Sequence, residues 1–337
     1  MKKIDLRSDT VTHPTKEMYE AMLHANIGDD VFEDDQEVQE LELMAATLLG
    51  KEAALFVPSG TFSNQLAIIT HTSTGDEVIV DQECHIVLHE TGAVSQIAKV
   101  QLFTLESNHG IWDLEKLKRS IKVGDTFTPH TSLICMENSF NGLVLPLDYM
   151  KEVYQIASKR HIKVHLDGAR LFNATTYLGV DAKELASCAD SVSICLSKGL
   201  CSPIGSLLVG SKEFIHKARR YRKMMGGGLR QVGILAACGK ISLNNMRLRL
   251  QVDHENRKYL ETRLEEMPFI NVNKIHNKIN LLFFEINHPK SSTLHTYLRT
   301  HNIFITPYED GIRFVVHNDV TRADIDFVIE KMKEYLM

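Results

Sequence analysis

Residues 193–209 read SICLSKGLCSPIGSLLV, an almost uncharged segment that contains one lysine, Lys198. Short, apolar runs at 191–196 and 206–209 are typical of strands that are covered on both faces. Lys198 therefore follows the end of a buried strand. Loss of solvation there favours the neutral amine, which is a nucleophile toward carbonyl carbons. The segment predicts a covalent role for Lys198; the alternative is a lysine that only reaches solvent at the sheet edge.

The rest of the sequence alternates strands with helices, which indicates an α/β fold with a parallel or mixed sheet. The 337 residues suffice for a large domain, predicted over 1–250, and a small α/β domain over 251–337. Further strands are predicted over 53–57, 77–80, 99–104, 132–137 and 163–167. Helices are predicted over 14–25, 36–49, 61–71, 87–97, 113–122, 148–160, 211–225 and 229–266.

Composition excludes several classes of protein. Apolar residues make up 44% and charged residues 24%, as in ordinary globular chains, and the net charge of −5 without a basic run argues against nucleic-acid binding. The N-terminus MKKIDLRSDT lacks the apolar core of a secretion signal, and no window of about 18 apolar residues is present. Six cysteines without a C-x-x-C pair, and no H-E-x-x-H, predict reduced thiols, a cytoplasmic location and no metal site.

A carboxylate follows another predicted strand, in KVHLDGARL (163–171). Ligands of α/β proteins bind at the carboxyl ends of parallel strands, so Asp167 is placed to hold a protonated pyridine nitrogen. Arg170 carries a fork of donors suited to a substrate carboxylate. Seen alone, the same pair is also explained as a helix N-cap with a surface arginine.

A third segment, LFVPSGTFSNQ (55–65), runs from a strand into a helix through Ser59, Gly60 and Thr61. Backbone N–H groups at a helix N-terminus bind anions such as phosphate. Alone the signal is weak, because serine and threonine are ordinary N-caps. Neither the Walker pattern nor G-x-G-x-x-G is present, which argues against a nucleotide-binding Rossmann protein.

A phosphate seat, a strand-end aspartate and a strand-end lysine in this order predict a site for pyridoxal phosphate. From residue 5 to about 320, the chain resembles the low-specificity L-threonine aldolases, which are fold-type-I pyridoxal-phosphate enzymes. The resemblance implies a mixed, mostly parallel seven-stranded sheet between helices, plus a small C-terminal α/β domain. The matching motifs are DLRSDTVT (5–12), GDDVFEDD (28–35), KEAALFVPSGTFSNQLA (51–67), CHIVLHETG (84–92), HLDGARLFNA (165–174), ICLSKGLCSPIGSLLVG (194–210), RKMMGGGLRQVGILAA (222–237) and IRFVVHNDVT (312–321).

The resemblance also implies roles for single residues. Lys198 resembles the lysine that forms the Schiff base with pyridoxal 5′-phosphate, and Asp167 the carboxylate on its pyridine nitrogen. His85 resembles the imidazole stacked on the ring, and Glu90 an active-site acid. The phosphate cradle is implied at Ser59, Gly60 and Thr61, with Arg230 supplied by a neighbouring subunit.

The substrate carboxylate is implied to bind Ser8, Arg170 and Arg313, with Arg170 also placed at the cofactor. By resemblance, the chain is a lyase of amino-acid metabolism that cleaves L-threonine, L-allo-threonine or related β-hydroxy-α-amino acids to glycine and an aldehyde. A homodimer or homotetramer with shared active sites is implied, and no nucleic-acid or membrane partner. Two alternatives remain: an aromatic amino acid β-eliminating lyase on the same fold, and a non-catalytic protein that binds pyridoxal phosphate.

The sequence departs from the family where a base is needed for the β-hydroxyl. Phe127 occupies the place of a family histidine, and the family's ENTHN reads ENSFN here, with Phe140 in place of histidine. We therefore predict a preference for a bulkier or less polar β-substituent. The base is left open among His130, His85, His89 with Glu90, and a water molecule.

Overall fold

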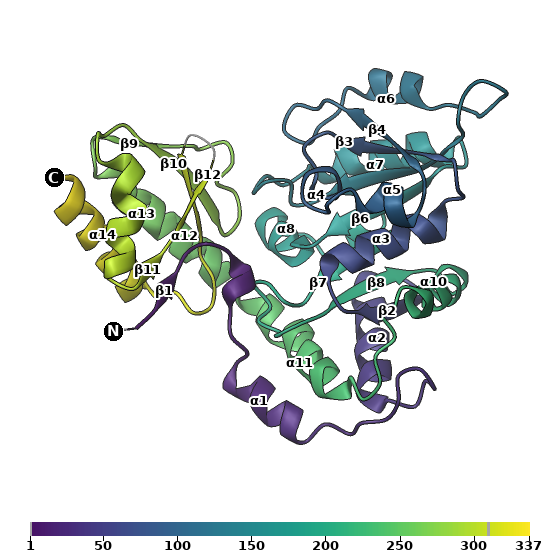
Figure 1. Ribbon diagram of the computed structural model, residues 1–337, viewed down its shortest axis with the longest axis horizontal. Coiled ribbons are helices and arrows are strands. Elements are labelled where there is room, and N and C mark those ends of the chain that lie inside the picture. The colour runs from purple at the N-terminus through teal and green to yellow at the C-terminus, as the bar shows by residue number, and fades with distance from the viewer. Residues whose placement is uncertain (1, 309–310) are drawn as a thin grey trace.

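A mixed sheet of seven strands, in the order β2-β8-β7-β6-β5-β3-β4, forms the centre of the large domain (Figure 1). The computed structural model describes residues 2–308 and 311–337. Only β8 runs against its neighbours in this sheet, so the predicted mixed, mostly parallel sheet is confirmed. The strands are β2 (Ala53–Val57), β3 (Glu77–Asp81), β4 (Gln101–Leu105), β5 (Thr131–Glu137), β6 (Lys163–Gly168), β7 (Ser191–Cys195) and β8 (Ser206–Gly210).

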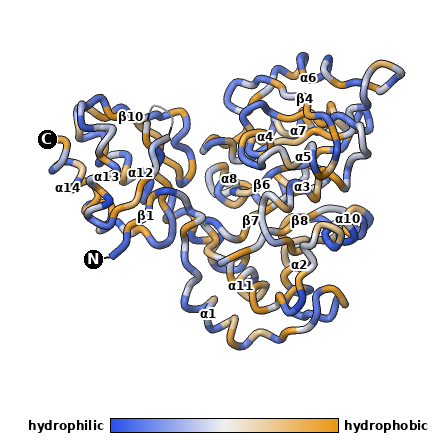
Figure 2. The backbone as a smooth tube through the Cα atoms, viewed as in Figure 1, coloured by the Kyte–Doolittle hydropathy of each residue, from blue (hydrophilic) through white to orange (hydrophobic). Residues whose placement is uncertain are grey.

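Helices cover both faces of this sheet, because successive strand residues point to opposite sides. In β2, Phe56 packs in the cluster beneath one layer of helices, whereas Leu55 and Val57 pack beneath the other. Figure 2 shows the resulting hydrophobic interior. One layer contains α2 (Gln36–Leu49), α7 (Leu147–Ser158), α8 (Leu171–Leu178), α9 (Ala182–Ala186) and α11 (Gly233–Asn244), and the other α3 (Gly60–His71), α4 (His85–Leu88), α5 (Ala93–Ile97) and α10 (Lys212–Met224).

Two predicted helices are interrupted. The helix expected over 87–97 is split into α4 and α5, because Thr91 and Gly92 adopt positive φ angles of 56° and 71° that end a right-handed helix. The helix expected over 229–266 is divided into α11, a 3₁₀ turn η2 (Met246–Arg249) and α12 (Leu250–Glu265). The other elements of the large domain are η1 (Asp9–Val11), α1 (Lys16–Leu23) and α6 (Leu114–Ser120).

The small domain packs helices against an antiparallel sheet of order β12-β13-β10-β9. Its core includes Ile4 and Leu6, so the first strand belongs to this core although the sequence-based division assigns it to 1–250. No helix within residues 2–308 and 311–337 is long and apolar enough to cross a bilayer. The elements are β1 (Ile4–Asp5), β9 (Ile270–Val272), β10 (Leu281–Ile286), η3 (Ser291–Thr293), α13 (Leu294–Thr300), β11 (Ile303–Phe304), β12 (Thr306–Tyr308), β13 (Gly311–Val315) and α14 (Arg322–Leu336).

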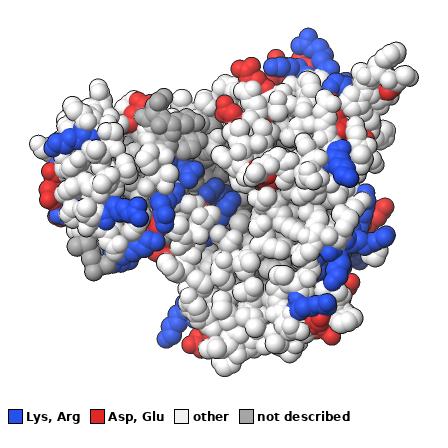
Figure 3. Space-filling view, viewed as in Figure 1, with Lys and Arg blue, Asp and Glu red and all other residues white. Residues whose placement is uncertain are grey.

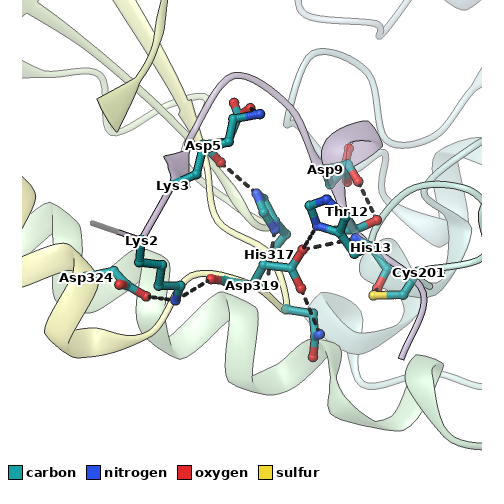
Figure 4. Close-up of polar contacts among 12 residues, drawn as sticks. Lys2, Lys3, Asp5, Asp9, Thr12, His13, Cys201, His317, Asp319 and Asp324 are labelled. Carbon is teal, nitrogen blue, oxygen red and sulfur yellow. Dashed lines mark hydrogen bonds and ion pairs between the residues drawn. The ribbon is translucent and has the colours of Figure 1, made fainter. Parts of the chain in front are cut away.

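The N-terminal segment 2–13 ties the two domains together (Figure 4). At its start, β1 pairs in parallel with β11, and the Asp5 carbonyl lies 2.7 Å from His317 Nε2. At its end, the Thr12 hydroxyl donates to the backbone carbonyl of Lys198 at 2.8 Å. The segment therefore contacts the small-domain sheet and the loop of the candidate nucleophile at the same time.

Candidate active site

The carboxyl edge of the large sheet gathers most of the predicted site residues. Strands β2, β3, β5, β6 and β7 all point the same way, so their ends meet at one edge, where α/β proteins bind ligands. Strand register places Asp167 beside Glu137 on one side and Ser193 on the other. The groups at this edge are Ser59 after β2, His85 after β3, Glu137 at the end of β5, Asp167 in β6 and Lys198 after β7.

Asp167 and Glu90 are joined by the side-chain amide of Asn64. The Asn64 amide nitrogen donates to Asp167 at 2.7 Å and to Glu90 at 2.8 Å, and Gln65 donates a further bond to Glu90. Ligand atoms of His85, Glu90 and Asp167 lie within 4.8 Å of one another, as metal ligands can. The amide donors already bind both side chains, so we interpret the cluster as a hydrogen-bond network that fixes Glu90 and Asp167 in place.

His85 is oriented by two glutamates. Its Nδ1 lies 2.9 Å from Glu90, and its backbone N–H donates to Glu137 at 2.7 Å. The hydrogen bond to Glu90 raises the pKa of His85, although partial burial acts against the shift. Burial and the neighbouring Asp167 raise the pKa of Glu137 well above its usual range. His85 is therefore held in one orientation with its protonated form favoured.

Lys198 is half-buried, rather than fully buried as the sequence suggests, and its backbone is fixed. The Lys198 carbonyl accepts hydrogen bonds from the Thr12 hydroxyl at 2.8 Å and the Cys201 N–H at 2.9 Å. Its side-chain nitrogen lies within electrostatic range of Asp9, His85 and Glu137. The amine is thus at the same sheet edge as Asp167 and His85, as predicted for a group that bonds a carbonyl carbon.

The helix start at Ser59–Gly60–Thr61 fits a phosphate. Ser59 is the N-cap of α3 and accepts the Phe62 N–H at 3.2 Å, so the helix dipole points at this turn. A Cβ built on Gly60 would meet only the Ser206 hydroxyl, at 3.8 Å. That hydroxyl is buried without a hydrogen-bond partner among the described residues. An orphaned donor beside an open helix start is what an anionic group would complete.

Arg170 is already engaged by the protein. Its Nε and one terminal nitrogen donate to the two carboxylate oxygens of Asp9, at 2.9 and 2.7 Å, in a bidentate pair. Burial acts to raise the pKa of Asp9, but the charges of Arg170 and Lys198 hold it far below its usual value. Nε and one terminal nitrogen of Arg170, which the sequence assigned to a substrate carboxylate, therefore serve Asp9, and the other terminal nitrogen makes no hydrogen bond within the described residues.

The other predicted substrate groups lie at the junction of the domains. Arg313, on β13, donates to the carbonyl of Arg7 at 3.2 Å and lies within electrostatic range of His89. Ser8 caps η1 by accepting the Thr10 N–H at 3.2 Å. Figure 3 shows Lys and Arg side chains along the notch between the two lobes, which favours an anionic ligand there.

Arg230 lies outside this cluster. Its side chain is 55% exposed and is paired with Asp29 at 3.2 Å. In the part of the chain that the structure describes, it makes no hydrogen bond to the cradle residues 59–61. The role implied for Arg230, as a phosphate ligand given to a neighbouring subunit, stays a prediction.

The two phenylalanines that replace family histidines lie in opposite environments. Phe127 is 93% exposed on the loop between α6 and β5, whereas Phe140 is 2% exposed in the apolar cluster with Cys84, Ile86 and Cys135. His130, on the same loop as Phe127, bonds the carbonyl of Val123. Within the described residues, neither phenylalanine lines a pocket beside His85, so the predicted preference for a less polar β-substituent gains no support from them.

Sequence reasoning missed the residues that connect the site. Asn64 and Gln65 hold the carboxylates, Asp9 takes up Arg170, and Glu137 orients His85. A signal was available for the first two, because Ser63-Asn64-Gln65 is a polar run inside an otherwise apolar helix. Asp9 had no local signal, since its partner lies 161 positions away.

Comparison with known proteins agrees with this geometry. The sequence matches the family described as Beta-eliminating lyase over residues 5–287. It is 41% identical to the low specificity L-threonine aldolase of Escherichia coli (strain K12) over 334 residues, 99% of each chain. It is 40% identical to low-specificity L-threonine aldolase 1 of Arabidopsis thaliana over 348 residues, 100% of this chain and 97% of that one.

Solved structures show the same fold at low sequence identity. The Leishmania major threonine aldolase superposes with a TM-score of 0.86 at 18% identity, covering 99% of this chain and 100% of that one. Sphingomonas wittichii serine palmitoyltransferase superposes with a TM-score of 0.78 at 12% identity, covering 99% and 87%. By sequence and by fold, the chain belongs to the low-specificity L-threonine aldolase family of lyases.

Proposed function

We propose that this lyase uses pyridoxal 5′-phosphate to cleave L-threonine, L-allo-threonine or related β-hydroxy-α-amino acids into glycine and an aldehyde. The observation that carries the proposal is the meeting of Lys198, Asp167 and His85 with an open helix N-terminus at one sheet edge. The curated relatives described above are named low-specificity L-threonine aldolases, which supports the proposal.

The residues present suit the cofactor. Lys198 provides the amine for its aldehyde, and Asp167 is a buried carboxylate for its pyridine nitrogen. The first turn of α3, with the Ser206 hydroxyl, provides donors for its phosphate. When bound, pyridoxal phosphate supplies an electron sink for the electron pair released at the substrate Cα.

On the substrate side, the chain binds the carboxylate and orients the bond to be broken. Arg313 and Ser8 lie at the domain junction, and Arg170 keeps one terminal nitrogen beyond its bonds to Asp9. A fixed carboxylate holds the Cα–Cβ bond in the orientation in which it breaks, and such positioning contributes a large part of enzymatic rate enhancement.

Assembly and location belong to the same proposal. Arg230 is exposed beside Asp29 and, within the described residues, makes no hydrogen bond to the phosphate cradle of its own chain, which supports a homodimer, or a homotetramer of such dimers, with shared sites. Six free, buried cysteines support a reducing compartment such as the cytoplasm. Sedimentation at decreasing concentration tests the assembly: cofactor should leave as dimers dissociate, and a monomer that retains it would contradict shared sites.

The activity is tested by adding L-threonine, L-allo-threonine and glycine to the purified protein with its cofactor. We expect the visible absorbance of the cofactor to change with all three amino acids, and an aldehyde plus glycine to appear from the first two. A protein that binds the cofactor but releases no aldehyde from any β-hydroxy amino acid would contradict the proposal.

Because the matching family is described as Beta-eliminating lyase, the products also decide between two reactions. β-Elimination releases ammonia and a 2-oxo acid, whereas aldol cleavage releases glycine and an aldehyde. An assay for ammonia with an aromatic amino acid as substrate separates them.

A further inference from the structure

Neither of the two residues that replace family histidines, Phe127 and Phe140, can take the proton of the substrate β-hydroxyl. Phe127 is on an exposed loop and Phe140 is in the core, as described above. His85 is engaged by Glu90 through Nδ1, and that hydrogen bond favours the protonated ring. One of the two ring nitrogens of His85 is thus already used by Glu90, so His85 is less suited to be the base than an imidazole with both ring nitrogens available.

His89 lies one helical turn after His85 and on the same side of the sheet. Its backbone N–H donates to the His85 carbonyl at 2.8 Å, and the two ring centroids are 5.5 Å apart. In the described part of the chain, neither ring nitrogen of His89 has a hydrogen-bond partner. The ring therefore has free acceptor capacity beside the imidazole that is implied to stack on the cofactor.

His89 also faces a cleft between the two domains. The cleft has a volume of about 620 Å³ and is lined by residues of both domains, including His109, His276, Phe283 and Ile312. Ile312 precedes Arg313, the predicted ligand of the substrate carboxylate, and Arg313 lies within electrostatic range of His89. A substrate whose carboxylate binds Arg313 would therefore lie near His89.

We propose that His89 is the catalytic base that accepts the proton of the substrate β-hydroxyl. This inference rests on the proposed function. In the step, the lone pair of a His89 ring nitrogen takes the hydroxyl proton, the O–H electrons form the aldehyde C=O, and the Cα–Cβ bond breaks. The electron pair of that bond remains at Cα, where a proton is later added to give glycine, so no further reactant is needed.

The protonation state of His89 agrees with this role. Partial burial, the neighbouring His85 and Arg313 all lower the pKa of His89, which favours the neutral ring. A neutral imidazole is the form that acts as a general base. Among residues 2–308 and 311–337, the titratable and charged groups around His89 are His85 on its own segment, Arg313 on β13, and Glu83, His109, His276 and Glu285 around the cleft.

Two variants test the proposal with two assays on the cofactor-loaded enzyme. His89→Gln removes the base, and His130→Gln removes the competing histidine on the 122–130 loop. The first assay is kcat/KM for L-threonine as a function of pH. The second is exchange of the glycine α-hydrogen with deuterated solvent, followed by NMR, which requires the cofactor and Cα chemistry but no β-hydroxyl base.

We expect His89→Gln to lower kcat/KM for L-threonine by about 10²–10⁴-fold, the usual contribution of a general base, while glycine exchange is unchanged. The rise of kcat/KM with pH, which reports deprotonation of the base, should disappear in this variant. His130→Gln should behave as wild type in both assays. Added imidazole should restore part of the activity of His89→Ala, which a purely structural role would not allow.

Three results would overturn the inference. One is a His89→Gln enzyme that cleaves L-threonine with the wild-type pH profile. Another is equal loss of cleavage and glycine exchange, which would place His89 at the cofactor instead. The third is loss of cleavage in His130→Gln. A wild-type protein that exchanges no glycine hydrogen would refute the proposed function itself, and the role of His89 with it.

Discussion

At the carboxyl edge of the sheet, Asp167 and Glu90 are buried and share the amide of Asn64, whereas in the cleft His89 is exposed and its ring has no hydrogen-bond partner within the described residues. The first region is fixed by strand register and a closed set of hydrogen bonds. The second is built from a short helix, loops and the small-domain sheet. Under the proposed function, cofactor chemistry would depend on the region fixed by strand register, and substrate selection on the region built from loops and the small-domain sheet.

The largest effect should come from the covalent group at the constrained edge. We expect Lys198→Ala to lower kcat by on the order of 10⁴-fold or more, as loss of a nucleophile does in other enzymes. The measurements are turnover of L-threonine and the absorbance of protein-bound cofactor. Undiminished turnover in Lys198→Ala would show that the sheet edge does not carry the covalent group, and the contrast with the cleft would fail.

Asp9→Asn tests how much the constrained side depends on one buried ion pair. The change leaves the Arg170 guanidinium buried without its counter-charge, which should lower the free energy of unfolding by about 3–5 kcal/mol. Because the folded pKa of Asp9 is depressed, its contribution is present at neutral pH and is lost as pH falls through that value. The difference between wild type and Asp9→Asn in the free energy of unfolding, measured with urea, should therefore become smaller as pH is lowered.

A surface pair is the matched control for Asp9. Asp148 is 92% exposed and pairs with Lys151. Asp148→Asn should lower the free energy of unfolding by less than about 1 kcal/mol. Equal losses in the two variants would show that the Arg170–Asp9 pair has no special role in stability.

Phe140 and Phe127 compare a buried and an exposed position with the same type of side chain. Phe140→Ala should lower the free energy of unfolding by about 3–5 kcal/mol, because it opens a cavity in a packed cluster. Phe127→Ala should change it by less than about 0.5 kcal/mol, because that ring is in solvent. Urea denaturation of the two variants side by side checks both expectations. A large loss of unfolding free energy in Phe127→Ala, measured in dilute protein, would mean that the Phe127 ring packs against the rest of the chain in solution.

The smallest effect concerns the pH dependence of the His85–Glu90 pair. The raised pKa of His85 means that the pair stabilises the fold below the ordinary histidine value, about pH 6.5, and that this contribution is lost as pH rises through the folded value. Glu90→Gln should therefore lower the melting temperature more at low pH than at high pH. NMR titration of the His85 ring should show its pKa falling; an unchanged value would exclude Glu90 as the cause.

Much of the constrained region was predictable from sequence, because its signals are local. Apolar runs define the strands, and a lysine, an aspartate and a serine that each follow a strand must meet at one sheet edge. Topology then brings Lys198, Asp167 and Ser59 together without any knowledge of side-chain contacts. The alternation of strands and helices predicted a parallel or mixed sheet, and the resemblance to the threonine aldolases implied the mixed, seven-stranded form that is confirmed.

The remainder depends on contacts between distant positions. The partners of Arg170 and of β1 lie 161 and about 300 positions away, and no local pattern reports them. The break between α4 and α5 depends on the positive φ of Thr91, a residue whose type does not favour that conformation. The environments of Phe127 and Phe140 were also beyond sequence reasoning, since both residues stand in loops flanked by polar residues.

The N-terminal segment has a mechanical consequence. Ile4 pairs with Ile303 in the parallel strands β1 and β11. Eight residues later, the Thr12 hydroxyl donates a hydrogen bond to the carbonyl of Lys198. A rotation of the small domain must therefore either pull on the lysine loop or release that hydroxyl. The position of the small domain and the loop that carries Lys198 are therefore physically linked through the first dozen residues, and shortening this segment would disturb both ends of the link.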